Sequence, residues 1–396
     1  MYFIGQTRFS LYIPGSNAWN VSNFTEEEYI AHLFSDERMA IRARIFSEIS
    51  VPMLAKMKGE FDYNHIVSYS SIMPEKWKKI LFDLQKNYPF IYLHEADKNK
   101  VNPIYPVLKN KPNGCIAFFR LDDDDLLSIN FLKSLSKYNN LAFRNMAVSF
   151  GKGFTGYYKE NHFIDFRECK QRFIAIGQAY IGTYIDGKVE LPVIHSHHNL
   201  DENYPVIVDS REFMYIHTHH AQQDTNYRFS NDSSNKTNTI ESDLMKYPKV
   251  KSSGIISENF PYLLKDVNDF LTNQKLVCNI NNLMLSNKYS TFEIKNNIED
   301  IVFDCEYELH TEKSISSSKA FVLSIFPEDS SSNIQGMTRS NNPEIGWYKY
   351  ISVSAGLSKG EFSFSLDKPM KIKKLKITIW DNRIKEAEIK SINLLS

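Results

Sequence analysis

Four consecutive aspartates, Asp122 to Asp125, are the residues of this chain best suited to chemistry. They follow the apolar run Cys115–Leu121, which the turn residues Asn113 and Gly114 precede, so the sequence predicts a strand that ends in an acidic turn. A continuous apolar strand is expected in a parallel sheet, where ligands bind at the carboxyl ends of the strands. Neighbouring carboxylates repel one another, so we expect a cation or a donor-rich ligand to neutralise them. A solvated acidic turn is the alternative.

The second candidate group is the histidine-bearing run Met214–His220. Strand alternation puts His217 and His219 on one face. A divalent ion held by one or two of the aspartates needs further ligands, and imidazole is a common one, so we expect a histidine of this strand to share a cation with the aspartates. A shift of one or two residues along the strand stays open, as does a structural role. A weaker cluster, before a loop-like segment, comprises His195, His197 and His198.

The segments before the aspartates alternate between strand and helix patterns. Strands are predicted at Tyr2–Ile13, Phe61–Tyr69 and Phe90–Leu93. Helices are predicted to begin at Glu26, after the capping box of Thr25 and Glu28, and at Pro74, and a further helix is predicted with Asp36 as its cap. The alternation predicts an α/β, Rossmann-like half-domain.

After the aspartates, the spacing of apolar residues predicts a helix over Leu126–Tyr138, capped at Ser128. Aromatic, glycine-bearing strands then follow at Met146–Tyr158, Phe163–Glu168 and Phe173–Ile185, as mixed or antiparallel additions to the sheet.

Beyond residue 275 the helical pattern almost disappears. Seven strand candidates with frequent turns predict a β-sandwich, and they lie at Thr291–Ile294, Ile301–His310, Ala320–Phe326, Trp347–Val353, Glu361–Leu366, Ile372–Trp380 and Ala387–Leu394. The predicted domains are a catalytic domain over 1–262, a helical linker over 263–274 and a β-sandwich accessory domain over 275–396. Trp347, Tyr348 and Tyr350 are candidates for stacking on sugar rings, with a core role for each as the alternative.

Composition limits the function classes. Lysine and arginine balance aspartate and glutamate at 47 each, and the densest basic run, Lys371–Lys376, alternates with apolar residues, so nucleic acid is not an expected partner. Four widely spaced cysteines predict reduced thiols and a cytoplasmic protein. No stretch approaches eighteen apolar residues, so we expect at most peripheral membrane contact, at the inner face of the membrane.

The run from Arg120 to Leu126 resembles the Arg-Leu-Asp-x-Asp-Asp signature of the bacterial family named putative rhamnosyltransferases. These are GT-A-like glycosyltransferases with an Asp-x-Asp motif. Looser similarity at Thr7-Arg8-Phe9 and at the histidine strand near residue 219 extends the resemblance to about residue 260. It implies a GT-A catalytic domain that uses a divalent metal ion, Mn²⁺ or Mg²⁺.

The resemblance also implies roles for individual residues. The implied metal ligands are Asp122, Asp124 and His219. The implied donor-binding residues are Arg8, Arg120, Asp122 and Asp123. Asp123 and Asp125 would shape the turn or bind sugar hydroxyls, and Asp125 is also a catalytic candidate.

The expected reaction moves a sugar from a nucleotide-sugar donor to a bacterial surface glycan of the capsule or lipopolysaccharide type. An inverting reaction needs a carboxylate as general base. Asp209 is the preferred candidate because Val206-Ile207-Val208 would deliver it at a strand end, while a cap or turn role remains open; the other candidates are Asp165, Glu168 and Asp224. The alternative functions are a metal-dependent phosphoesterase and a calcium-dependent carbohydrate-binding protein.

Overall fold

The computed structural model describes the chain except for residues 15–23, 99–100, 194–198, 224–239 and 287. It forms two compact units, Met1–Lys236 with Lys249–Leu271, and Thr237–Pro248 with Thr272–Ser396. The helix α11 (Leu264–Asn273), which the sequence predicts as a linker, packs Val267 and Phe270 into the core of the first unit. It is therefore part of that unit. His195, His197, His198 and Asp224 lie outside the described residues.

The first unit begins with alternating strands and helices. Its elements up to the acidic turn are β1 (Tyr2–Arg8), α1 (Glu26–Leu33), α2 (Asp36–Arg44), the π-helix η2 (Ile45–Ser50), α3 (Val51–Lys58), β2 (Tyr63–Tyr69), α4 (Glu75–Asn87), β3 (Ile91–Glu95), α5 (Ile104–Leu108) and β4 (Gly114–Arg120). The capping box is formed: the Glu28 amide donates to the Thr25 hydroxyl at 3.2 Å, and the Thr25 amide donates to the Glu28 carboxylate at 2.8 Å. The N-cap of α2 is Ser35, and Asp36 is its first residue.

The remaining elements of this unit are shorter. They are β5 (Leu126–Leu127), α6 (Phe131–Leu135), the 3-10 helix η3 (Leu141–Phe143), β6 (Ala147–Phe150), β7 (Lys152–Lys159), β8 (His162–Lys170), β9 (Ala179–Ile185), β10 (Lys188–Glu190), α7 (Leu200–Asn203), β11 (Val206–Asp209), β12 (Tyr215–His219), α10 (Ser253–Asn259), the 3-10 helix η5 (Pro261–Leu263) and α11.

The main sheet of the first unit has the strand order β11-β6-β9-β4-β1-β2-β3, with β10 paired to β9. Strands β3, β2, β1 and β4 run parallel, whereas β9 is antiparallel to both β4 and β6. The unit is therefore a mixed α/β structure in which β4 is a central strand. This explains the uninterrupted apolar run before the aspartates, since Ile116, Phe118 and Phe119 are all buried.

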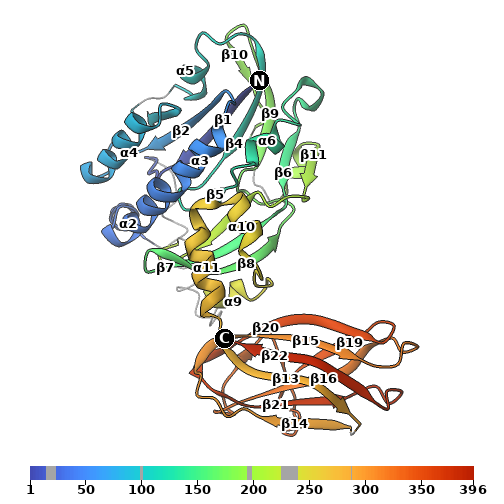
Figure 1. Ribbon diagram of the computed structural model, residues 1–396. Helices are drawn as coiled ribbons and strands as arrows, with labels where there is room; N and C mark the ends of the chain where they lie inside the picture. Colours follow the sequence, from blue (N-terminus) through green and yellow to red (C-terminus); the bar gives the residue numbers. More distant parts are fainter. Residues whose placement is uncertain (15–23, 99–100, 194–198, 224–239, 287) are drawn as a thin grey trace. The chain divides into compact units, whose positions relative to one another are not determined.

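A second, smaller sheet has the order β5-β12-β7-β8, and Figure 1 shows α10 and α11 lying across it. The prediction of a helix over Leu126–Tyr138 is wrong for its first half. Leu126 and Leu127 pair with Ile216 and Tyr215 of β12, so the segment after the aspartates is held extended, and α6 begins only at Phe131. Apolar residues at helical spacing cannot reveal a strand partner about ninety positions away.

The second unit contains α9 (Ile240–Leu244) and two antiparallel sheets, ordered β13-β22-β15-β20-β17 and β14-β21-β16-β19-β18. The strands are β13 (Leu276–Leu285), β14 (Tyr289–Glu293), β15 (Asp300–His310), β16 (Ser317–Pro327), β17 (Ile334–Gln335), β18 (Thr338–Arg339), β19 (Trp347–Val353), β20 (Leu357–Met370), β21 (Ile372–Ile379) and β22 (Ala387–Leu395). Apolar residues of both sheets share one core.

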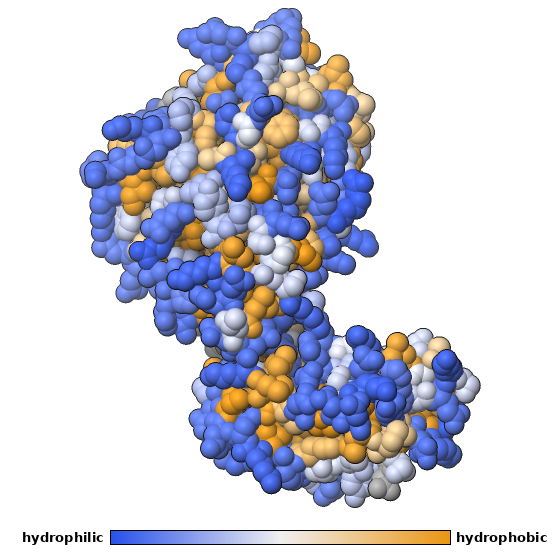
Figure 2. Space-filling view, viewed as in Figure 1, coloured by the Kyte–Doolittle hydropathy of each residue, from blue (hydrophilic) through white to orange (hydrophobic). Residues whose placement is uncertain are grey.

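Trp347 belongs to this core and is 8% exposed, which favours its core role over stacking on a sugar ring. Tyr348 and Tyr350 are half-buried. Figure 2 shows hydrophobic residues gathered on the visible face of the second unit, and the exposed apolar side chains of β13 are Leu276, Leu283 and Met284. Within the described ranges, no helix has the length and apolar character needed to cross a bilayer.

Candidate active site

The acidic turn begins where β4 ends, beside the end of β1. Arg120 lies opposite Gln6 in the parallel pairing, and the Leu121 amide donates to the Gln6 carbonyl at 3.0 Å. The chain then folds back, with the Asp125 amide 3.3 Å from the Asp122 carbonyl oxygen. This places the four aspartates at the carboxyl end of a parallel strand pair, the position at which α/β sheets bind ligands.

Asp123 is buried and is held by two residues from outside the turn. The backbone amide and the hydroxyl of Ser10 lie 2.9 and 3.2 Å from its Oδ2, and Nη1 of Arg42 donates to its Oδ1. Ser10 adopts a left-handed backbone with φ 40°, which non-glycine residues rarely adopt, and Nη1 of Arg38 donates to its hydroxyl at 2.9 Å. Asp123 is therefore a fixed internal acceptor that joins the turn to β1 and α2.

Asp124 receives two hydrogen bonds on one oxygen. Nη2 of Arg42 and Nε2 of His220 each lie 3.0 Å from its Oδ2. Burial acts to raise the pKa of Asp124, but the charge of Arg42 and the hydrogen bond from His220 outweigh it and hold that pKa below its usual range. Asp124 is thus a stable carboxylate with its charge largely balanced by the protein.

Asp125 ties the turn to the histidine strand. The Thr218 amide of β12 donates to its Oδ1 at 2.9 Å, and the Ser50 hydroxyl lies 3.4 Å from its backbone carbonyl oxygen. Burial together with the charges of Asp124 and Asp122 raises the pKa of Asp125 well above its usual value. Its contacts give Asp125 a positioning role, and the catalytic role predicted for it stays a prediction.

Asp122 differs from the other three because its side chain is exposed. Desolvation by the surrounding protein raises the pKa of Asp122, and the charges of Asp124 and Asp123 raise it further. The charges of Arg8 and Arg42 act in the opposite direction. Desolvation and the nearby charge of Arg8 lower the pKa of Arg120. The exposed Asp122 and Arg8 and the half-buried Arg120 therefore form a group that presents both signs of charge to solvent.

The histidine strand lies against the aspartates, but the residue that contacts them is His220. His220 is buried, whereas His219 is half-buried and its ring centroid lies 4.6 Å from that of His217. The shared cation of Asp124 and His219 stays a prediction. Sequence reasoning missed His220 because it follows the last residue of β12, where strand alternation no longer decides which way a side chain points.

Arg42 is the other site residue that the sequence analysis missed. A signal was present: Arg38 and Arg42 stand four positions apart on α2, beside the buried Met39 and Ala43, so two cations occupy the buried face of a helix. Buried cations need anionic partners, and the acidic turn is the obvious source.

The proposed base Asp209 lies at the end of β11, the edge strand that β6 and β9 separate from β4. Nη2 and Nε of Arg211 lie 2.7 and 2.9 Å from its two carboxylate oxygens, and the Tyr138 hydroxyl donates to it at 2.8 Å. These contacts, the Arg211 hydrogen bonds first, lower the pKa of Asp209. The structure does not bring Asp209 into contact with the acidic turn in any described interaction, and a carboxylate paired in this way is a weak base.

The other carboxylates considered as bases lie on β8. Asp165 pairs with the fully buried Arg167, whose Nη2 lies 3.1 Å from it, and Glu168 is half-buried on the same strand.

One carboxylate at the edge of the acidic turn is open to a cation from solvent. In the described part of the chain, no set of three or more histidine, cysteine, aspartate or glutamate side chains has the geometry of a metal site. Asp122 nevertheless combines exposure with a pKa that is raised first by desolvation and then by the charges of Asp124 and Asp123, and an added cation would offset the repulsion between these carboxylates. Asp122 and Asp124 would hold such an ion, with ligands from solvent or substrate completing its shell.

The chain is similar to several solved structures and to one protein family. Two structures of TarS from S. aureus are similar to this chain. The structure of TarS 1–349 matches at 12% identity and TM-score 0.29, over 55% of this chain and 60% of the TarS chain. A second TarS structure matches at 9% identity and TM-score 0.27, over 92% of this chain and 72% of the TarS chain. The structure titled BiXyn10A CBM1 matches at 10% identity and TM-score 0.17, covering 30% and 72%. The search of curated proteins returned no match. Residues 2–232 match the family described as "Putative rhamnosyl transferase". Since that match covers more than half of the chain, the protein belongs to this family, and with it to the glycosyltransferases.

Proposed function

We propose that the chain is a metal-dependent glycosyltransferase with a GT-A-like domain, which moves a sugar from a nucleotide-sugar donor to a bacterial surface glycan. The observation that carries the proposal is the division of the aspartates into three that the protein holds and one, Asp122, that faces solvent beside Arg8 and Arg120. Two arginines close enough for one to lower the pKa of the other favour an anionic ligand between them, and a diphosphate is such a ligand.

The residues of the site have separate tasks in this reaction. The leaving nucleoside diphosphate gains negative charge as the glycosidic bond breaks, so Arg8 and Arg120 stabilise it more strongly in the transition state than in the bound donor. A divalent ion held by Asp122 and Asp124 would supply Lewis-acid stabilisation of the same diphosphate. Arg42 and His220 keep Asp124 ionised and in place, which preorganises the site.

We also propose that His219 is a ligand of this ion, as its place on β12 beside the turn allows. The experiment compares two neighbouring histidines. His219→Ala should weaken Mn²⁺-dependent binding of a nucleoside diphosphate and leave the melting temperature of the ligand-free protein nearly unchanged. His220→Ala should lower the melting temperature without ligand, since it leaves a buried carboxylate with one partner fewer. If both variants showed the same change in Mn²⁺-dependent binding and in melting temperature, the proposal that His219 binds the ion while His220 stabilises the fold would be wrong.

The proposed activity is tested by thermal melting with UDP, GDP and dTDP, followed by hydrolysis of the corresponding nucleotide sugars. We expect a nucleoside diphosphate to raise the melting temperature only with Mn²⁺ or Mg²⁺, and Asp122→Asn to remove the increase. Stabilisation by Ca²⁺ and a free sugar, with none by any diphosphate, would instead support the calcium-dependent carbohydrate-binding alternative. Hydrolysis of simple phosphate esters at the same site would support the phosphoesterase.

We assign the second unit an accessory role as a β-sandwich that holds the acceptor glycan. One row of paired residues crosses the sheet that contains β14, β21, β16 and β19. In this row Tyr289 pairs with Thr378, Thr378 with Val322, and Val322 with Tyr350. Trp380 is 46% exposed, and its ring centroid lies 5.8 Å from that of Tyr350. Exposed aromatic rings with polar neighbours suit the flat, partly apolar faces of sugar rings.

A further inference from the structure

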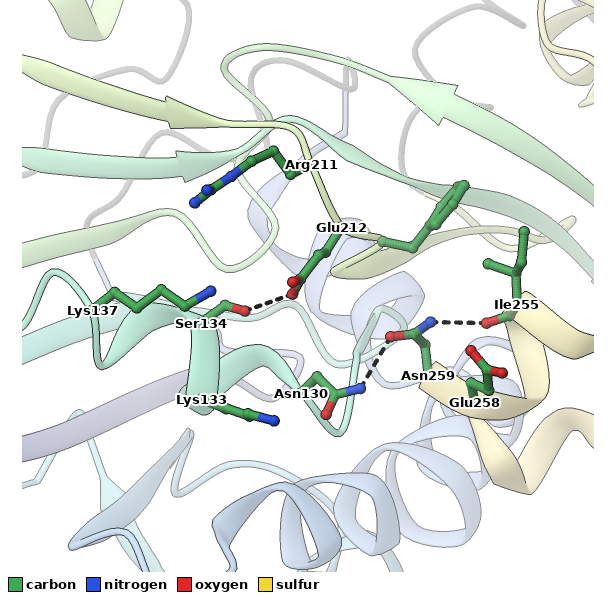
Figure 3. A pocket seen from close by; sticks show the side chains of 10 residues that line it. Asn130, Lys133, Ser134, Lys137, Arg211, Glu212, Ile255, Glu258 and Asn259 are labelled. Atoms are coloured by element: carbon green, nitrogen blue, oxygen red, sulfur yellow. Dashed lines mark hydrogen bonds between the residues drawn. The ribbon is translucent and has the colours of Figure 1, made fainter.

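The first unit contains a cavity of about 430 Å³ that the proposed reaction does not use. It lies between α6, the segment that joins β11 to β12, and α10, and Figure 3 shows the side chains that line it. This volume falls within the range of small-molecule sites. The cavity is therefore large enough for a sugar unit.

Three cationic side chains line the cavity, together with the carboxylates of Glu212 and Glu258. Lys133 lies on α6 and Lys137 on the turn that follows it, whereas Figure 3 shows Arg211 on the segment that also carries Glu212. Arg211 already binds the carboxylate of Asp209 through two nitrogens. The exposed ammonium groups of the two lysines thus carry the positive charge that a ligand would meet.

The cavity lining also contains hydrogen-bonding groups that the protein holds in place. The buried Ser134 hydroxyl donates to Glu212 at 2.9 Å, and the Asn130 amide donates to Asn259 at 3.3 Å. Asn259 is itself held, because its amide nitrogen donates to the Ile255 carbonyl at 2.9 Å. Carboxylate and amide groups held in this way suit the hydroxyls of a carbohydrate.

The cavity is distant from the aspartates but connected to them through β12. Phe213, which lines the cavity, precedes this strand, and His220, which binds Asp124, follows it. Seven residues of extended chain span roughly 20 Å at about 3.3 Å per residue. A sugar in the cavity is thus too far away to react, whereas an acceptor of several sugar units could reach both places.

We propose that this cavity is a distal acceptor subsite that binds a glycan unit carrying an anionic group, with Lys133 and Lys137 on the anion and Glu212 and the Asn130–Asn259 pair on the hydroxyls. The proposal rests on the proposed glycosyltransferase activity. It adds the charge of the acceptor and a second point of contact, both of which can be measured in the absence of donor.

The experiment measures binding to the full chain by isothermal titration calorimetry with three probes. A hyaluronan tetrasaccharide carries carboxylates, glucose 6-phosphate carries a phosphate, and maltotetraose is neutral. We expect at least one anionic probe to bind about tenfold more tightly than the neutral one, and the double variant Lys133→Ala/Lys137→Ala to lose that advantage. The stronger of the two anionic probes identifies the group as carboxylate or phosphate.

The matched control is Lys79→Ala/Lys86→Ala, which removes the same charge from exposed positions of α4. It should bind all probes as the unmodified protein does. Equal affinity of the unmodified protein for neutral and anionic probes, absence of binding by any anionic probe, or unchanged binding by the Lys133/Lys137 variant would each overturn the proposal. Donor hydrolysis with Mn²⁺ is measured in parallel: its absence in the unmodified protein contradicts the proposed function, whereas normal hydrolysis with unchanged probe binding contradicts the subsite alone.

Discussion

Arg42→Met should destabilise the first unit strongly, because it removes the cation shared by two buried carboxylates. Arg42 binds Asp123 through Nη1 and Asp124 through Nη2, and all three side chains are less than 9% exposed. Removal of one partner from a buried ion pair typically costs about 3–5 kcal/mol. For a unit of this size, that corresponds to a fall in melting temperature of roughly 6–20 °C.

The destabilisation should also depend on pH. In the unmodified protein the pKa of Asp124 is lowered, so its ionised form contributes stability that is present above the ordinary carboxyl pKa and is lost as the pH falls through the lowered value. In Arg42→Met, burial and the neighbouring aspartates raise this pKa. The loss of unfolding free energy should therefore be largest near neutral pH and should shrink as the pH approaches about 5, where the carboxyls take up protons.

The assay is thermal and urea-induced unfolding near pH 7 and pH 5, with Arg44→Met as the control. Arg44 lies two positions along the same chain segment, but it is only half-buried, contacts no residue of the acidic turn in any described interaction, and its Nε lies 3.5 Å from the exposed Glu48, so its replacement should cost about 1 kcal/mol or less. A melting temperature of Arg42→Met within about 2 °C of the unmodified protein at neutral pH, or an equal loss at both pH values, would refute this account of the acidic turn.

Three further predictions concern other parts of the chain. Burial lowers the pKa of His65 to about 3, so between about pH 6.5 and pH 3 the unfolded chain binds a proton that the folded chain does not. The free energy of unfolding should therefore decrease as the pH is lowered through this window, by up to about 1.4 kcal/mol per pH unit. His65→Gln should reduce this dependence on pH, measured by urea unfolding. Asp209→Asn should keep the transfer rate within about twofold while lowering the melting temperature, since its carboxylate is paired with Arg211; a loss of about a hundredfold or more would make it the base. A chain ending at Gln274, which keeps α11 whole, should hydrolyse donor but lose transfer to a polymeric acceptor, and failure of this shortened chain to fold would show that the units are interdependent.

The central strand and the acidic turn could be predicted because their signals are local. An apolar run of strand length that ends on charged residues needs no knowledge of its partners, and β4 follows it closely. The alternation before it is equally local, and α1, α4, β2 and β3 appear where periodicity and capping residues place them. The strand β13 was missed because polar residues interrupt its apolar pattern: it is an edge strand, and several of its side chains are exposed.

The contacts inside the site could not be predicted in the same way, since each joins residues far apart in sequence. Arg42 and Asp123 are 81 positions apart, and His220 and Asp124 are 96 apart. Sequence patterns placed histidines near the aspartates in general terms, but the choice between His219 and His220 depends on where β12 ends. The pairing of β12 with β5 and β7 determines where the strand ends, and the residue pattern within β12 does not reveal this pairing.

The four aspartates do not act as one acidic patch. Asp123 and Asp124 share the charge of Arg42 on α2, and Asp125 accepts a hydrogen bond from β12, so the three are fixed to elements outside the turn. These three attachments fix the backbone of the turn and therefore the position of Asp122, whose own side chain faces solvent. Replacement of an inner aspartate should thus lower stability and misplace Asp122, whereas replacement of Asp122 should remove ligand binding and leave the fold intact. The order of the four residues matters because only the first of them, where the turn leaves β4, can both stay exposed and lie beside Arg8 and Arg120.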